Sequence, residues 1–398
     1  MSRLSRCLAT SLLLVAVAST LFAAGFGLGR YVFPASQPSG SAGRSQNLDV
    51  LSEAWSLIER SFYRLEPLDD RTMLYGAIKG MVATLGDRYT AFFTPEQADL
   101  FQQDLEGSFA GIGVTVGTTD DGDFRVMRPL AGTPGAEAGL VPGDILVAVD
   151  GIPLRGMEFF EAISLMRGQA GTKVRLLVRH ANGVENEYSI VRAVIQVPTV
   201  DSKVLADGIG YVALSEFNGR ATEELRSHLR ALLQDGSVAL ILDLRGNPGG
   251  YLHVAVEVAS EFIREGVIVI ERSSDGKETT RSASGSGLAT DVPLMVLVDG
   301  SSASAAEIVA GAIQDLGRGI VIGERTLGKG SVQITERLSD RSALQITIER
   351  WYTPADRGIH GEGLEPDLPV ALSEEDIKNG RDPPLERAMA LLMEQRQQ

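Results

Sequence analysis

The stretch GERTLGKGSVQ, residues 323–333, holds a lysine in a setting that would suit either a phosphate ligand or a general base. Its start has the G-x-x-x-x-G-K spacing of phosphate-binding loops, but Gly330 occupies the position that needs Ser or Thr. The residues after Gly330 alternate like a strand, whereas a phosphate-binding loop runs into a helix. We therefore set phosphate binding aside and consider Lys329 as a base.

A lysine accepts a proton only when its amine is neutral, and burial lowers its pKa from about 10.4 towards that condition. Lys329 lies between Gly328 and Gly330 and has no charged neighbour in the sequence, so a confined site could hold it. Because strand side chains alternate, Lys329, Ser331 and Gln333 share one face, where Gln333 could orient the amine. The alternative is an exposed lysine in a glycine turn.

A nucleophile for this base is offered by DGSSASAAEIVAGAIQDLG, residues 299–317, where an apolar strand runs into a helix. A serine at such a turn is exposed, and the amides at the helix N-terminus can stabilise an oxyanion. Ser304 is the candidate, although Ser304 and Glu307 also fit a capping box in which the serine only caps the helix. Asp315 lies about 16 Å further along the helix and is expected to form a structural ion pair.

The four histidines are weaker candidates for the base. His180 ends a predicted strand and His228 lies in a charged helix, while His253 and His360 have no orienting carboxylate motif nearby. A Ser-Lys dyad, in which lysine replaces histidine, is therefore the chemistry that we favour.

The stretch VALILDLRGNPGG, residues 238–250, predicts a buried strand, a tight turn and then a helix. Glycine amides can approach a substrate carbonyl closely, so Gly249 or Gly250 could join Ala305 in an oxyanion hole. An ordinary turn between a strand and a helix is the alternative.

These motifs belong to an alternating pattern of apolar strands and helices that begins near residue 200. The predicted strands cover residues 210–217, 238–246, 266–272, 292–300, 319–324 and 331–338. The predicted helices cover residues 221–236, 251–266 and 304–317. Apolar strands that alternate with helices predict a layered α/β domain whose strands are buried on both faces.

The chain before this domain divides into three further parts. Residues 109–180 contain short β-branched runs between Gly, Pro and Asp, which predict a small β-rich module. Amphipathic helices are predicted at residues 48–64 and 72–86. Within residues 1–30, two arginines precede an apolar run that is long enough, at about 35 Å as a helix, to cross a bilayer.

We interpret residues 1–30 as a signal anchor, with a cleaved signal peptide as the alternative. Either interpretation exports the rest of the chain, which then has no disulfide because Cys7 is the only cysteine. A formal net charge of -15 disfavours nucleic acid as a partner, since such binding requires clustered Lys and Arg.

Taken together, SASAAEIVAGAIQD, GERTLGKGSVQ and the upstream DLRGNPGG resemble the carboxyl-terminal processing peptidases, a family of Ser-Lys serine proteases. The resemblance implies that Ser304 is the nucleophile, Lys329 the base and Gln333 the glutamine that orients the lysine. All three spacings are met without a gap. Ala306 departs from the family pattern, in which many members carry a second serine, and this leaves the assignment of Ser304 unchanged.

The resemblance covers nearly the whole exported chain and implies a multidomain protein of α/β and α+β class. Its protease domain would have a crotonase/ClpP-like α/β fold with an inserted PDZ domain. The implied map is a signal anchor or signal peptide at 1–30, a flexible linker at 31–46, an N-terminal helical region at 47–105, the PDZ domain at 106–182, the protease domain at 195–372 and a C-terminal helical tail at 373–398.

A PDZ domain binds an extended peptide as an additional strand and holds its terminal carboxylate with backbone amides. The candidate peptide-binding residues are Gly111, Ile112, Gly113, Val114 and Leu165. Their apolar side chains lead us to expect partners with apolar C-termini. Arg167 is a candidate for coupling peptide binding to the protease site, and a simple helix C-terminal charge is the alternative.

The resemblance thus implies a membrane-tethered, ATP-independent serine endopeptidase of the cell envelope that cuts exported proteins near their C-termini. It implies neither a metal nor a cofactor, and the N-terminal helices suggest a homodimer. Two alternatives are a catalytically silent PDZ scaffold and a crotonase-like enzyme that acts on acyl-thioesters. The second of these fits export and a PDZ module poorly.

Overall fold

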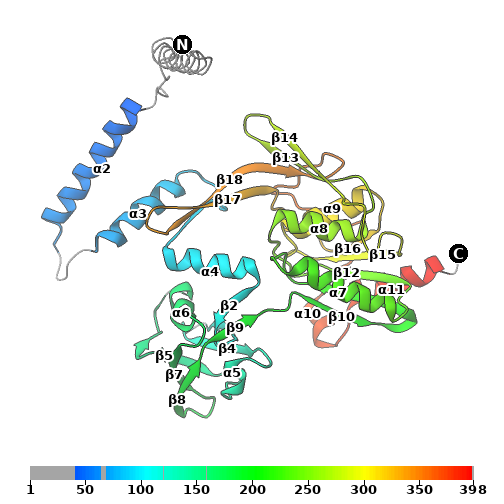
Figure 1. Cartoon of the computed structure of the whole chain (residues 1–398), viewed down its shortest axis with the longest axis horizontal. Coiled ribbons are helices and arrows are strands. Elements are labelled where there is room, and N and C mark those ends of the chain that lie inside the picture. The colour runs from blue at the N-terminus through cyan, green and yellow to red at the C-terminus, as the bar shows by residue number, and fades with distance from the viewer. Residues whose placement is uncertain (1–40, 64–68, 120, 158, 397–398) are drawn as a thin grey trace, which may run out of the picture. The chain divides into compact units, whose positions relative to one another are not determined.

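The computed structural model describes residues 41–63, 69–119, 121–157 and 159–396 (Figure 1). The chain forms two units, residues 1–74 and 75–398. Helix α2 (Ser41–Ser61) lies in the first unit, and α3 (Asp70–Ala83) begins there. Helix α2 starts at Ser41, so residues 41–46 are helical, which differs from the flexible linker expected at 31–46.

The predicted anchor, residues 1–30, lies outside the described residues. Among the residues that the structure describes, no helix combines the length and the apolar character that crossing a bilayer requires.

A six-stranded sheet forms the centre of the region that follows residue 200. In spatial order its strands are β10 (Val200–Val204), β11 (Ile209–Leu214), β12 (Ala239–Asp243), β15 (Leu294–Val298), β16 (Ile320–Gly323) and β19 (Leu368–Pro369). The five strands from β11 onward are parallel, and β10 pairs antiparallel with β11 at one edge. The apolar strands predicted from the alternating pattern are therefore the core of this sheet.

Apolar side chains are buried on both faces of this sheet, as the sequence predicts. One face packs against α7 (Ala221–Gln234), α8 (Leu252–Phe262) and α9 (Ala305–Asp315). The other face packs against α11 (Pro383–Arg396), which contributes the fully buried Ala388 and Leu392. The C-terminal segment, which also contains α10 (Glu374–Lys378), thus contributes to the core of this sheet and is not an appendage.

A second, antiparallel sheet stands beside the first. It consists of β1 (Ala91–Phe93), β18 (Ala343–Tyr352), β13 (Val267–Ser273), β14 (Glu278–Ser282) and β17 (Ser331–Arg337). Two strands that we placed in the α/β layer, β13 and β17, belong here, and Figure 1 shows β17 running along β18. The exposed polar residues of β17 suit an antiparallel sheet better than a doubly covered one, whereas β13 joins this sheet by pairing with β14 and β18.

The β-rich module forms its own core around a third sheet. Its strands are β3 (Val114–Thr118), β4 (Phe124–Pro129), β5 (Ile145–Val149), β6 (Ile152–Pro153), β7 (Lys173–Arg179) and β8 (Glu185–Val191), with helices α5 (Pro134–Glu137) and α6 (Phe159–Met166). A short ribbon of β2 (Ser108–Gly111) and β9 (Ala193–Gln196) leads into and out of the module. Helix α4 (Pro95–Glu106) precedes β2 and begins with a capping box formed by Thr94 and Gln97.

Candidate active site

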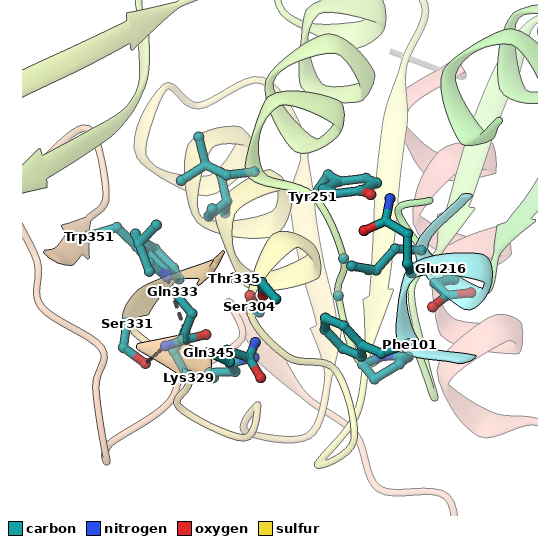
Figure 2. A pocket seen from close by; sticks show the side chains of 18 residues that line it. Phe101, Glu216, Tyr251, Ser304, Lys329, Ser331, Gln333, Thr335, Gln345 and Trp351 are labelled. Carbon is teal, nitrogen blue, oxygen red and sulfur yellow. Dashed lines mark hydrogen bonds between the residues drawn. The ribbon is translucent and has the colours of Figure 1, made fainter. Parts of the chain in front are cut away.

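One cleft of about 490 Å³ brings together Ser304, Lys329 and Gln333 with Gly249 and Gly250 (Figure 2). Ser304 lies between two walls in this view. One wall carries Lys329, Ser331, Gln333 and Trp351, and the other carries Phe101, Glu216 and Tyr251. The wall residues on α4, on β18 and at position 216 form no recognisable motif, and sequence reasoning missed them.

Ser304 occupies a strained turn between β15 and α9, with φ 53° and ψ -112°. A positive φ is unfavourable for a residue other than glycine, and such strain clusters at functional sites. Gly249 lies directly against this turn, because a Cβ at position 249 would be 2.7 Å from the Ser304 Cβ. The turns that carry Gly249 and Ser304 are therefore in direct contact, and only glycine fits at position 249.

Backbone bonds fasten these two turns together. The Ala303 amide donates to the Asn247 carbonyl at 2.9 Å, and the buried Ser302 hydroxyl donates to the Leu244 carbonyl at 2.8 Å. The Gly249 amide donates to Asn247 Oδ1 at 2.8 Å and is thereby occupied. Of the three predicted oxyanion donors, the amides of Gly250 and Ala305 have no hydrogen-bond partner among the described residues.

Glu307 connects Ser304 to the loop that carries Lys329. Its carboxylate, 1% exposed, accepts the Ser304 amide at 2.7 Å, which confirms that half of the predicted capping box. It also accepts the amides of Gly328 and Lys329, at 2.7 and 2.9 Å, and the Thr326 hydroxyl at 2.5 Å. Sequence reasoning treated Glu307 only as a capping residue, and its spacing from Ser304 was the sole available signal.

The Lys329 side chain is half-buried, and burial lowers its pKa, while Glu307 and Asp87 act in the opposite direction. Its Nζ has no hydrogen-bond or ion-pair partner within the described chain and lies 5.2 Å from the centroid of the Tyr89 ring. Its backbone is fixed, because the carbonyl accepts Trp351 Nε1 at 3.0 Å. The lysine is thus confined, as expected, but no bond connects it to Ser304 in this state.

Steric crowding explains why glycine occupies the positions on either side of Lys329. A Cβ at Gly330 would lie 2.9 Å from the His360 Cβ, and one at Gly328 would lie 2.7 Å from the Gly363 amide nitrogen. The turn around residues 360–363 therefore packs directly on the lysine loop.

Gln333 lines the cleft but contacts other partners than the one we expected. Its Nε2 donates to Ser331 Oγ at 2.9 Å and to Thr347 Oγ1 at 3.1 Å. An irregularity in the β17–β18 register between Val332 and Gln333 interrupts the simple alternation from which we placed Gln333 beside Lys329. The role of Gln333 in orienting the lysine stays a prediction.

The remaining polar candidates lie elsewhere. His180 contacts Asp144 and Tyr188, His228 contacts Ser202, and none of the four histidines lines the cleft. Asp315 forms an ion pair with Arg357, as expected. Across the described ranges, no group of three or more His, Cys, Asp or Glu side chains could hold a metal ion.

A second cavity of about 260 Å³ lies between β3 and α6 in the β-rich module. Ile112, Gly113 and Val114 line it, as expected, whereas Leu165 packs against the module's core. The residues that α6 contributes to the cavity include Ile163 and Met166. Gly111 precedes this loop and lies under the Phe109 ring, which a Cβ there would approach to 3.0 Å.

Arg167 connects this groove to α4. It lines the groove, its guanidinium lies 4.2 Å from the centroid of the Phe109 ring, and it donates to Asp104 at 2.7 Å. Phe101 and Leu105 on the same α4 helix line the serine cleft. One helix therefore contacts both sites.

Comparisons with known proteins agree with this architecture. Residues 208–370 match peptidase family S41, residues 125–180 match a PDZ domain, and residues 33–97 match the N-terminal domain of the activating protease CtpB. The multidomain α/β fold with a PDZ domain that we predicted is confirmed.

Similar full-length proteins carry consistent names. The carboxyl-terminal-processing protease of Synechocystis sp. is 33% identical over 92% of this chain and 91% of its own length. The carboxy-terminal processing protease CtpA of Bacillus subtilis is 35% identical over 84% of this chain and 71% of its own. A solved structure of a photosystem II D1 C-terminal processing protease is 31% identical, covers 80% of this chain and 86% of its own, and has a TM-score of 0.50.

Proposed function

Since this chain belongs to the carboxyl-terminal processing proteases of peptidase family S41, we propose that it is a serine endopeptidase in which Ser304 is the nucleophile and Lys329 the general base. The observation that carries the proposal is the shared cleft. A strained serine, Gly250 with its amide unpartnered among the described residues and a half-buried lysine meet there, and Glu307 binds the backbones of both the serine and the lysine.

The reaction follows from these positions. Ser304 Oγ attacks the scissile carbonyl while neutral Lys329 Nζ takes its proton. The oxyanion accepts hydrogen bonds from the Gly250 and Ala305 amides. When the tetrahedral intermediate collapses, Lys329 gives the proton to the leaving amine. Water then attacks the acyl-enzyme while Lys329 takes a proton from it. When the second tetrahedral intermediate collapses, Lys329 gives this proton to Ser304 Oγ, and the product leaves with its new C-terminal carboxyl group.

The PDZ groove is proposed to select the substrate by its C-terminus. Ile112, Val114 and Met166 line it with apolar side chains, which suits an apolar terminal residue. Arg167 would transmit occupancy of the groove to the cleft through Asp104 and α4. An Arg167→Ala variant should then bind a C-terminal peptide but lose its stimulation of cleavage, and unchanged stimulation would contradict the coupling.

The setting of the enzyme is also proposed. Residues 1–30 would anchor it in a membrane, with the protease on the periplasmic or extracellular side, where exported proteins are its substrates. Cleavage would need no ATP, as the family resemblance implies. The exposed apolar side chains of α2, Leu48, Val50, Leu51, Leu57 and Ile58, would form a homodimer contact.

The test is cleavage of an unstructured protein with an apolar C-terminus by the full-length parent and by its Ser304→Ala and Lys329→Ala variants. Ser301→Ala, an exposed serine of the same cluster, is the matched control. We expect the parent and the control to cut and the two other variants to be silent. A parent that binds the C-terminal peptide but does not cut it under any condition would favour the scaffold alternative.

A further inference from the structure

The loop at residues 87–90, which leads into β1, reaches the proposed base. The Tyr89 ring is half-buried, and its centroid lies 5.2 Å from Lys329 Nζ. The same ring is approached by the Arg88 guanidinium at 4.7 Å and by the His360 ring at 5.9 Å between centroids. A segment that lies more than 200 residues before the lysine in the sequence thus supplies an aromatic ring beside the lysine amine.

The loop is held in place by the sheet that carries the base half of the cleft. Thr90 Oγ1 donates to Asp87 Oδ2 at 2.7 Å and accepts the Thr347 amide at 3.1 Å. The hydroxyl of the same Thr347 accepts the Gln333 amide, and β1 pairs with β18 from Ala91 onward. Tyr89 is therefore fixed in register with the cleft.

The face of an aromatic ring attracts a cation within about 6 Å of its centroid and has no comparable attraction for a neutral amine. A general base must be neutral, and it must come within about 2.6–3.2 Å of the proton's oxygen. Among the described residues, Lys329 Nζ has no hydrogen bond to Ser304, and it lies beside the ring instead. The contact with Tyr89 accordingly belongs to the resting enzyme.

We propose that Tyr89 is a positioning residue for the base: its ring holds the charged Lys329 in a resting position, from which the amine must depart to accept the Ser304 proton. The inference rests on the proposed role of Lys329. It makes the segment before β1 part of the active site. This segment would then influence the fraction of enzyme in which Lys329 is neutral and free to approach Ser304.

Other charged groups around the lysine set the background for this effect. Glu307 on α9 and Asp87 in the loop both favour the charged amine, and burial opposes them. Arg88 and His360 contact the Tyr89 ring, and the pKa of His360 is lowered by burial and by Arg350 and Arg88. The ring is therefore one of three groups that favour the charged lysine. Removing it should lower the pKa of Lys329 only modestly, because the other two groups remain.

The first experiment compares the pH dependence of kcat/KM for the full-length parent, Tyr89→Leu and Tyr89→Phe. Leucine keeps the site apolar but removes the ring, whereas phenylalanine keeps the ring and removes only the hydroxyl. We expect the acid limb of Tyr89→Leu to shift down by about 0.4–0.7 pH units, which is an activity about 2.5–5 times that of the parent on that limb. Tyr89→Phe should follow the parent. An unshifted limb in Tyr89→Leu, or an equal shift in both variants, would overturn the proposal.

A second measurement does not depend on turnover. In a Ser304→Ala background, the rate at which acetic anhydride modifies Lys329 is followed against pH by mass spectrometry, with exposed Lys277 as the internal reference. The midpoint for Lys329 should fall by the same amount when Tyr89 is replaced by leucine, and an unchanged midpoint overturns the inference. Failure of the proposed function would look different, because the Lys329→Ala enzyme would then remain active.

Discussion

The two halves of the active site are held in different ways. The nucleophile half, at the carboxyl ends of the parallel strands, is fixed through its backbone: Ser304 is strained, and Gly249 packs against it. The base half, on the antiparallel sheet, fixes only the backbone of Lys329, whose amine contacts the Tyr89 ring. In the proposed mechanism the attacking oxygen is therefore already positioned, and the reaction depends on movement of the lysine side chain.

The largest effect should come from disturbing the locked half. In Gly249→Ala the new Cβ would lie 2.7 Å from the Ser304 Cβ at a φ of +103°, so the nucleophile or the oxyanion turn must move. Displacing either of these elements costs ~100- to 1000-fold in rate, and we expect kcat to fall by that factor. Gly246→Ala is the control, because it has a positive φ in the same turn but open space around it. Equal losses in both variants would show that general turn strain, and not contact with Ser304, is responsible.

Glu307 is the point at which the two halves meet, and its replacement should affect both. In Glu307→Gln one carboxylate oxygen becomes an NH₂ group that faces N–H donors from the serine or the lysine loop. We expect the free energy of unfolding to fall by about 1–3 kcal/mol and kcat/KM to fall by ~10- to 100-fold. Denaturant unfolding and peptide cleavage measure the two effects. Exposed Glu324→Gln is the control. Parent-like activity in Glu307→Gln would show that Glu307 does not couple the serine to the lysine loop.

The contrast between the halves also explains what the sequence could predict. Strands β11, β12, β15 and β16 are short apolar runs bounded by turns, and Ser304, Gly249 and Gly250 lie in the turns that follow them. Such local signals are sufficient because the parallel strands bring their carboxyl ends to one edge. Local motifs in the sequence were therefore enough to identify the residues around Ser304.

The base half depends on pairings that are distant in sequence and that no local pattern reveals. Strand β1 pairs with β18 across some 250 residues, and this pairing brings Tyr89 to Lys329 and Thr90 to Thr347. The register irregularity next to Gln333 likewise results from pairing with β18 and cannot be seen in the alternation of β17 alone. Sequence reasoning therefore found the lysine but not its surroundings.

The pH dependence of activity should reflect the protonation of Lys329 and not the geometry around Ser304. Burial lowers the pKa of Lys329, so the neutral amine is populated at a lower pH than for an exposed lysine. Activity should be high above that pKa and should fall about tenfold for each pH unit below it, because only the neutral amine accepts the serine proton. The measurement is kcat/KM against pH, with Gly246→Ala as a variant that should keep the same limb. A profile that stays flat towards acid pH would contradict a lysine base.

The smallest effect should come from the outer contacts of the base half. Thr347→Val removes one of the two acceptors of the Gln333 amide and leaves its bond to Ser331, so about 0.5–1.5 kcal/mol is at stake. We expect kcat/KM to fall by ~2- to 10-fold with unchanged folding, and Thr335→Val, the same change elsewhere in the cleft, to resemble the parent. Because Gln333 keeps its bond to Ser331, this loss should remain well below that of Gly249→Ala. A loss as large as that of Gly249→Ala would mean that the surroundings of Gln333 are as rigid as those of Ser304. The position of the lysine side chain would then not limit activity.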